Sequence, residues 1–212
     1  MVFTPALFFT GAMLIVNFGI SCFNAASVGK IWTESKQIGG GARVLAVCGY
    51  IMAIAGFTMV YSIILTYIVA YVVPMLGYLS ADELSFLLDI VSDLSYVLVA
   101  LAIIPTGIII WINSLISFWK RKSLRSGGIA AWNTFAMAHN VISASRNLPG
   151  AFKRIANTAK NVRGNAGIIV LAILIVLCAI LGGYFTASAI MKRSDRKYDL
   201  FDRVNGGQNL AS

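Results

Sequence analysis

The chain has 212 residues, of which 58% are hydrophobic and only 12% charged. Average soluble domains carry about 25% charged residues, so the low charge and a mean hydropathy of +0.82 exclude a single soluble core. The net charge of +9 comes largely from bases beside apolar stretches. Attraction to anionic lipid headgroups accounts for such bases, so no specific nucleic-acid binding is expected. The composition predicts an all-α, polytopic integral membrane protein with one membrane domain over residues 1–191.

The first span is predicted at residues 6–28. Signal peptides usually begin with a basic region, and the chain has no Lys or Arg before Lys30, so we interpret this segment as a retained span. Three polar residues share one helical face within it, namely Asn17, Ser21 and Asn24. We expect this face to hydrogen-bond with other helices, and the alternative is a polar lining for a pathway through the membrane.

A short link with three glycines at 39–41 leads to a second predicted span at residues 44–73, which contains no charge. A helix rises about 1.5 Å per residue, so this span exceeds the hydrocarbon core of about 30 Å and must tilt, bend or project from the membrane. Small residues recur along one of its faces, at Gly49, Ala53 and Gly56. This spacing predicts close packing against a neighbouring helix.

An acidic segment without a base follows, with Asp82, Glu83, Asp89 and Asp93. The pattern from Ser80 to Glu83 is that of a capping box and predicts a helix start. Leucine and valine residues at helical spacing oppose the acids. We therefore predict an amphipathic helix at residues 81–93, lying at the membrane surface or leading directly into the next span. The acids are interpreted as a solvated face, not as a cation site.

The third predicted span covers residues 94–119. Pro105 near its middle removes one helix hydrogen bond and predicts a kink, and Thr106 is available to satisfy freed backbone groups. Trp111 and Trp119 approach the end where the basic segment Lys120–Lys122 begins, as is typical of a span that leaves the bilayer on its basic side.

Residues 120–163 form a basic region without acids, expected to be cytoplasmic and amphipathic. Residues 127–145 are just long enough to span, but their polarity favours an interfacial or re-entrant helix. A basic amphipathic helix is predicted from Pro149 onward, suited to headgroups or an acidic partner. His139 is the only histidine, and no second ligand or carboxylate neighbour suggests a role for it. The candidate lipid- or partner-binding residues are Lys120, Arg121, Lys122, Arg125, Lys153, Arg154, Lys160 and Arg163.

The last predicted span covers residues 167–191 and is the most uniformly apolar. Gly182 and Gly183 each lie four residues after a small residue, a spacing that suits close packing of helices. The polar tail at residues 192–212 is predicted to be disordered. The three cysteines, Cys22, Cys48 and Cys178, lie inside apolar stretches and are interpreted as packing residues without disulfides or metal.

The distribution of bases orients the chain but does not decide the number of spans. Four spans put 12 Lys and Arg on the cytoplasmic side and five outside, and five spans, with residues 127–145 crossing, give the same two numbers. Both topologies keep the N-terminus and the acidic segment outside. Hydropathy favours four transmembrane helices plus interfacial amphipathic helices, with five spans possible.

The sequence carries no motif for catalysis, nucleotide binding or metal binding, so we expect neither an enzyme nor a cofactor. The favoured hypothesis is a non-catalytic subunit of a larger membrane assembly of a secretion, conjugation or phage-encoded kind. It would lie in a bacterial inner (cytoplasmic) membrane and contact lipids, other membrane proteins or itself through the basic region. The alternatives are an oligomeric, holin-like pore and a small-solute transporter.

Overall fold

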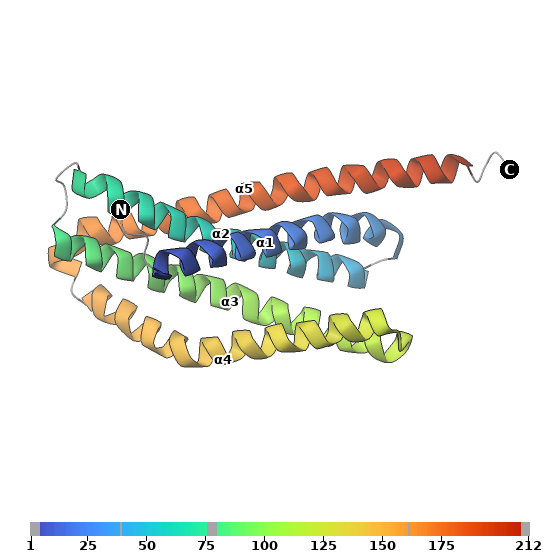
Figure 1. The fold of residues 1–212 in the computed structure, drawn as a ribbon, viewed down its shortest axis with the longest axis horizontal. Coiled ribbons are helices and arrows are strands. Elements are labelled where there is room, and N and C mark those ends of the chain that lie inside the picture. Colours follow the sequence, from blue (N-terminus) through green and yellow to red (C-terminus); the bar gives the residue numbers. More distant parts are fainter. Residues whose placement is uncertain (1–4, 39, 76–79, 161, 209–212) are drawn as a thin grey trace.

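The computed structural model describes residues 5–38, 40–75, 80–160 and 162–208, and all of these residues except Ser80, Lys122 and Ser123 are helical. Five helices follow one another along the chain (Figure 1). They are α1 (Pro5–Ile38), α2 (Gly40–Met75), α3 (Ala81–Arg121), α4 (Leu124–Lys160) and α5 (Val162–Gln208). Four of them contain stretches long and apolar enough to cross a membrane, at Gly11–Ser35, Gly40–Val72, Asp82–Arg121 and Ala166–Tyr198. The predicted all-α membrane fold with four such helices is therefore confirmed.

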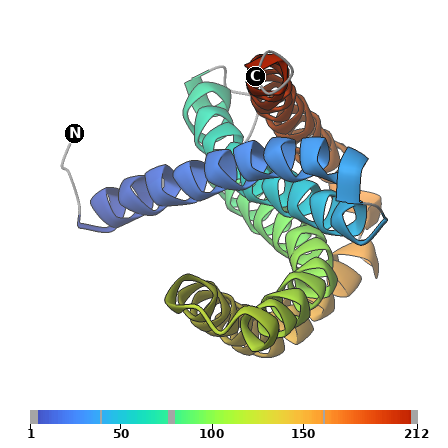
Figure 2. The same cartoon turned by 90° about the vertical axis from the view of Figure 1, so that its right-hand side faces the viewer.

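The helices form an elongated bundle in which each runs opposite to the one before it (Figure 1). α2 lies at the centre, in contact with α1, α3 and α5. α1 and α4 lie on opposite sides of the α2–α3 pair, as the end-on view shows (Figure 2). Among the described residues, α4 has an extensive contact with α3 only. It is therefore the outermost helix of the bundle.

The alternating directions collect the charges unequally at the two ends of the bundle. The α1–α2 link, the α3–α4 turn and the C-terminal part of α5 lie at one end, which holds 12 of the 17 Lys and Arg and is called here the basic end. The other end holds five bases and four of the eight acids and is called the acidic end. Nearly all of the net positive charge therefore lies at the basic end.

Two apolar clusters hold the bundle together. Toward the acidic end, Leu87, Ile90 and Val91 of α3 pack on a face of α5 that begins at Ile168 and includes the fully buried Ala172. Toward the basic end, small residues bring three helices close together around one aromatic ring, through Ala25, Ala53, Phe57 and Ala187. In a membrane, such contacts stabilise the bundle through van der Waals packing. Lipid tails are as apolar as these side chains, so moving a side chain from lipid into the bundle gives no hydrophobic gain.

α3 joins the predicted acidic helix and the third span into one helix. Ser80 begins it with the predicted capping box, in which its hydroxyl accepts from the Glu83 backbone N–H at 3.3 Å and its own N–H donates to the Glu83 carboxylate at 2.8 Å. Lys122 ends the helix in the left-handed region, with φ 46°. The α3–α4 turn that follows is short, so α4 folds back directly along α3.

α4 differs from the prediction of two separate segments with a break at Pro149. The helix continues through Pro149, which lies inside Leu124–Lys160. Proline removes one backbone hydrogen bond, and α4 curves in this half, but contacts with α3 on both sides of Pro149 keep the helix beside α3 (Figure 1). Ser143 before the proline contacts Tyr96, and Arg154 after it contacts Asp93.

Residues 192–208, which were expected to belong to a disordered tail at 192–212, are helical in the structure and belong to α5. The beginning of this segment binds α1, because Ser194 donates to the Ala26 backbone oxygen and Asp195 accepts from the Thr33 hydroxyl. Residues 209–212 lie outside the described part of the chain. α1 likewise continues past its predicted end to Ile38, and Gly40 and Gly41 of the glycine run belong to the first turn of α2.

Candidate functional site

The contact between α3 and α4 contains an ion pair between Asp93 and Arg154. Arg154 donates from Nε to Asp93 Oδ2 at 2.7 Å and from Nη2 to Oδ1 at 2.6 Å. Two parallel bonds of this kind are among the strongest between side chains. The Asp93 side chain is only 10% exposed, whereas that of Arg154 is 62% exposed. Arg154 therefore neutralises a buried carboxylate from the outer side of the bundle.

Helical spacing explains why these groups meet. Asp89 and Asp93 lie one turn apart on α3, and Asp89 also acts electrostatically on Arg154. On α4, Asn147 and Ser143 lie about two and about three turns before Arg154, on a similar face. Tyr96 and Ser143 share a hydrogen bond at 3.3 Å, and Asn147 Nδ2 donates to Ser143 Oγ at 3.5 Å.

The polar contacts continue along the α3–α4 seam toward the basic end. Trp111 Nε1 donates to Thr134 Oγ1 at 2.9 Å, and Thr134 also donates to the backbone oxygen of Ala130 at 2.8 Å. Between these contacts lies a small hollow of about 30 Å³, where Gly107 faces α4 and the amides of Asn133 and Asn140 are part of the lining. A hollow of this size with two amides is large enough for a water molecule.

A larger cavity, of about 400 Å³, lies between α2 and α3 toward the acidic end. Its apolar wall includes Met59, Ile63 and Leu88. Its polar groups are hydroxyls and one carboxylate, contributed by Ser62, Thr66, Tyr67, Asp89, Ser92, Ser95 and Tyr96. Ser95 donates to Ser62 at 2.9 Å, so these two buried hydroxyls satisfy one another. Because Tyr96 lines this cavity and also contacts Ser143, the cavity and the α3–α4 seam adjoin.

The polar face of α1 packs differently from the expected interhelical hydrogen bonding. Asn17 donates to the backbone oxygen of Met13 at 2.9 Å, and Ser21 donates to that of Asn17 at 2.7 Å, so both bonds stay within α1. Ser21 is buried against Gly56 of α2. Asn24 is half-buried. The described bonds of Asn17 and Ser21 therefore lie within α1 and not between helices, because hydroxyl and amide groups can bond to their own preceding turn.

The candidate basic residues do not form one surface. Lys120, Arg121, Lys122 and Arg125 lie exposed at the basic end, while Lys153, Arg154 and Lys160 lie at the acidic end. The full length of α4 separates the two groups. The side chain of Arg163 lies outside the described part of the structure.

Small residues allow close helix contacts at several of the predicted positions. A Cβ on Gly49 would lie 2.7 Å from Val28, and a Cβ on Gly183 would lie 2.9 Å from the Ile54 backbone oxygen. A Cβ on Gly182 would lie 3.2 Å from the ring of Tyr61, and Ala53 is fully buried. These contacts join α2 to α1 on one side and to α5 on the other.

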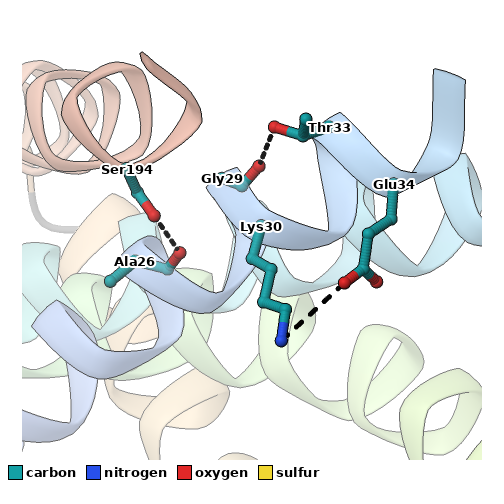
Figure 3. A network of polar contacts seen from close by, with 6 residues as sticks. All are labelled: Ala26, Gly29, Lys30, Thr33, Glu34 and Ser194. Atoms are coloured by element: carbon teal, nitrogen blue, oxygen red, sulfur yellow. Dashed lines mark hydrogen bonds and ion pairs between the residues drawn. The ribbon is translucent and has the colours of Figure 1, made fainter. Parts of the chain in front are cut away.

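The contact between α1 and the end of α5 was not predicted from the sequence. Ser194 donates to the Ala26 backbone oxygen at 2.7 Å, and Lys30 and Glu34 form an ion pair at 3.8 Å nearby (Figure 3). The Thr33 hydroxyl donates to Asp195 Oδ1 at 2.6 Å, and the Gly29 backbone oxygen, at 3.1 Å, is a second acceptor for the same proton. Gly29 allows this approach, since a Cβ there would lie 2.6 Å from that of Ser194. A glycine next to charged residues late in a span was the signal available in the sequence.

Elsewhere among the described residues, side chains that could take part in catalysis or metal binding lie apart from one another. Within the described part of the chain, no group of three or more His, Cys, Asp or Glu side chains is arranged to hold a metal ion. His139 is exposed on α4, and the thiols of Cys22, Cys48 and Cys178 are free. Comparison with protein-family models, with curated proteins and with solved structures found no match for this chain.

Proposed function

We propose that this protein is a non-catalytic subunit of a larger assembly in a bacterial inner membrane, and that α4 carries its main contact with partner proteins. The observation that supports this proposal is that α4 buries one face against α3 and exposes His139 on an outer face that otherwise includes apolar side chains such as Trp132, Phe135 and Ile142. The inward face recurs every seven residues and is buried against α3, at Ala130, Met137, Ala144 and Ala151. His139 and Arg146, also seven residues apart, are exposed.

The position of α4 beside α3 makes this outer face unusual for a membrane protein. Thr134 and Ser143 of α4 contact Trp111 and Tyr96, which both lie within the apolar stretch at residues 94–119. If that stretch crosses the bilayer, the outer face between Thr134 and Ser143 lies at the depth of the hydrocarbon core. Lipid chains satisfy no polar group, so an exposed imidazole at this depth requires a protein partner.

In this proposal α4 is a fifth pass through the membrane. Its two ends lie beside opposite ends of α3, so both helices cross if either does. The positive-inside rule then assigns the basic end to the cytoplasm and the N-terminus to the outside. There Lys120, Arg121 and Arg125 are exposed to anionic headgroups, each with an attraction of about 1 kcal/mol near such a surface.

Site-specific photocrosslinking tests the proposed partner surface. A benzophenone amino acid at position 139 is expected to give one discrete protein adduct in native membranes, with a corresponding large complex on a native gel. The matched control is the same probe at Leu177, an exposed apolar position on α5. At that position lipid is the expected neighbour, so no protein adduct should form.

Three outcomes contradict the proposal. Lipid adducts alone at position 139 would show that no protein covers α4. Ion flux through the purified protein in liposomes, lost when Asn17 and Asn24 are replaced by leucine, would favour the holin-like pore. Saturable uptake of a defined solute would favour the transporter.

A further inference from the structure

The cavity between α2 and α3 lies where a membrane changes from hydrocarbon to headgroups. Its deep end, at Met59 and Ser62, is within the apolar stretch of α2. Its outer end includes Tyr67, which is exposed, as tyrosines at membrane interfaces commonly are. Asp89 lines the cavity four residues before the buried Asp93, where the charge-free stretch of α3 begins. The cavity lies at this depth if α2 and α3 cross the bilayer, whether or not α4 also crosses.

The electrostatics of the cavity favour a cationic group. Asp89 is the one charged residue in its described lining. The nearby charges are Asp93 and Arg154, which neutralise each other through two hydrogen bonds, so the three groups together carry one net negative charge. A carboxylate at the edge of a low-dielectric site attracts an ammonium group more strongly than it would in water.

The hydroxyls that line the cavity favour a primary ammonium over a quaternary one. Ser92 is exposed beside Asp89, and Tyr96 lies one turn further along α3. A primary ammonium has three N–H donors, so these oxygens can accept bonds that the Asp89 carboxylate leaves unused. A quaternary ammonium has no donor and gains nothing from them. Arg154 binds Asp93 through Nε and Nη2, so the remaining N–H groups of its guanidinium, on a side chain that is 62% exposed, can donate to a phosphate oxygen near Asp89.

We propose that this cavity is a lipid site that binds a phospholipid with a zwitterionic, primary-amine headgroup, of which phosphatidylethanolamine is the example. The ammonium binds Asp89, the phosphate faces Arg154, and one acyl chain follows the apolar wall past Met59 and Ile63. The volume of about 400 Å³ lies within the range of about 300–1,000 Å³ typical of small-molecule sites. A lipid is favoured over a soluble amine because the cavity lies within the membrane-embedded length of α2 and α3.

The test is native mass spectrometry of the full-length protein with phospholipids of identical acyl chains. Phosphatidylethanolamine is expected to bind about tenfold more tightly than phosphatidylglycerol or phosphatidylcholine, which corresponds to loss of one charge-assisted contact. Asp89→Asn should remove this preference. Asp82→Asn is the matched control, because it removes the same charge from the exposed first turn of the same helix. It should bind as the original protein does.

A second variant tests the shape of the cavity independently of the charge of Asp89. Ser92→Leu places a bulky side chain at the cavity wall and keeps Asp89, so it should weaken phosphatidylethanolamine binding while the melting temperature in detergent is maintained. The proposal is overturned if phosphatidylglycerol binds as tightly, if Asp89→Asn and Asp82→Asn have the same effect, or if Ser92→Leu binds normally. Equal binding of phosphatidylcholine would overturn the requirement for a primary amine.

Discussion

Arg154 binds Asp93 through two hydrogen bonds although 61 residues separate them along the chain, and it does so from a far more exposed position than its partner. This unequal burial has a consequence for stability. A buried carboxylate that loses its base must remain charged in a poorly solvated place, become protonated or admit water. An arginine that loses its acid keeps access to water or to lipid headgroups.

We therefore predict that Arg154→Gln lowers the melting temperature in detergent more than Asp93→Asn does. The double variant should resemble Asp93→Asn, because with the carboxylate gone the loss of the base matters little. Thermal unfolding of the four proteins measures this directly. Lys153→Gln, which removes a neighbouring exposed base, is the control and should leave the melting temperature unchanged. Equal and additive losses from the two single substitutions would contradict the unequal roles.

Gly29 provides a second prediction, on the α1–α5 contact. A Cβ at this position would lie 2.7 Å from the Met191 backbone oxygen and 2.9 Å from the Asp195 nitrogen, so the helices must move apart to accept it. Gly29→Ala is expected to reduce the free energy of unfolding by about 1–3 kcal/mol, the usual cost of overpacking.

Gly19 is the matched control for this substitution. It lies on the same helix, and a Cβ there would meet nothing within 4 Å. Gly19→Ala is expected to be neutral or to stabilise by up to about 1 kcal/mol, because alanine favours helix more than glycine does. Denaturation in mixed micelles compares the two. A larger loss from Gly19→Ala would mean that α1 and α5 do not approach as described.

The long apolar stretches of the sequence were sufficient to predict the helical membrane fold. Four charge-free runs have the length and hydropathy of spans, and the capping box at Ser80 indicates the start of α3 correctly. Local patterns failed where a distant partner decides the structure. Residues 192–208 have the composition of a disordered tail, but Ser194 and Asp195 bind α1 and the helix continues.

The ion pair shows the same limit more clearly. Asp93 fits a solvated acidic face, and Arg154 fits a helix that binds headgroups, so each is consistent with its own amphipathic pattern. Which acid meets which base depends on the register of α4 against the antiparallel α3. Contacts such as that of Tyr96 with Ser143 set this register. The sequence was compatible with either topology, because four and five spans give the same numbers of Lys and Arg on the two sides of the membrane.

Thr33 supports a prediction about the end of α5. Its side chain is buried and its hydroxyl donates to Asp195 at 2.6 Å. Thr33→Val keeps the shape and removes the donor, so the last turns of α5 should be held less firmly against α1. Trypsin is expected to cut at Arg196 and Lys197 faster in this variant. Thr66→Val, a change of the same kind at a residue lining the α2–α3 cavity, should leave the cleavage rate unchanged.

The number of passes is tested by labelling single cysteines from each side of the membrane, after the three natural cysteines are replaced by alanine. Arg125 and Arg193 are exposed at the basic end, and Asp82 and Lys160 are exposed at the acidic end. With α4 as a fifth pass, cysteines at the first two positions should react only from the cytoplasm. Cysteines at the last two should react only from outside.

Position 160 distinguishes the two topologies. If α4 lay on the membrane surface, its two ends would be on one side, and cysteines at 125 and 160 would both react from the cytoplasm. That result would require α4 to leave α3 in the bilayer and Arg154 to leave Asp93. Arg154→Gln would then have no effect on the melting temperature in membranes, whereas with α4 crossing it should destabilise the protein there as well as in detergent.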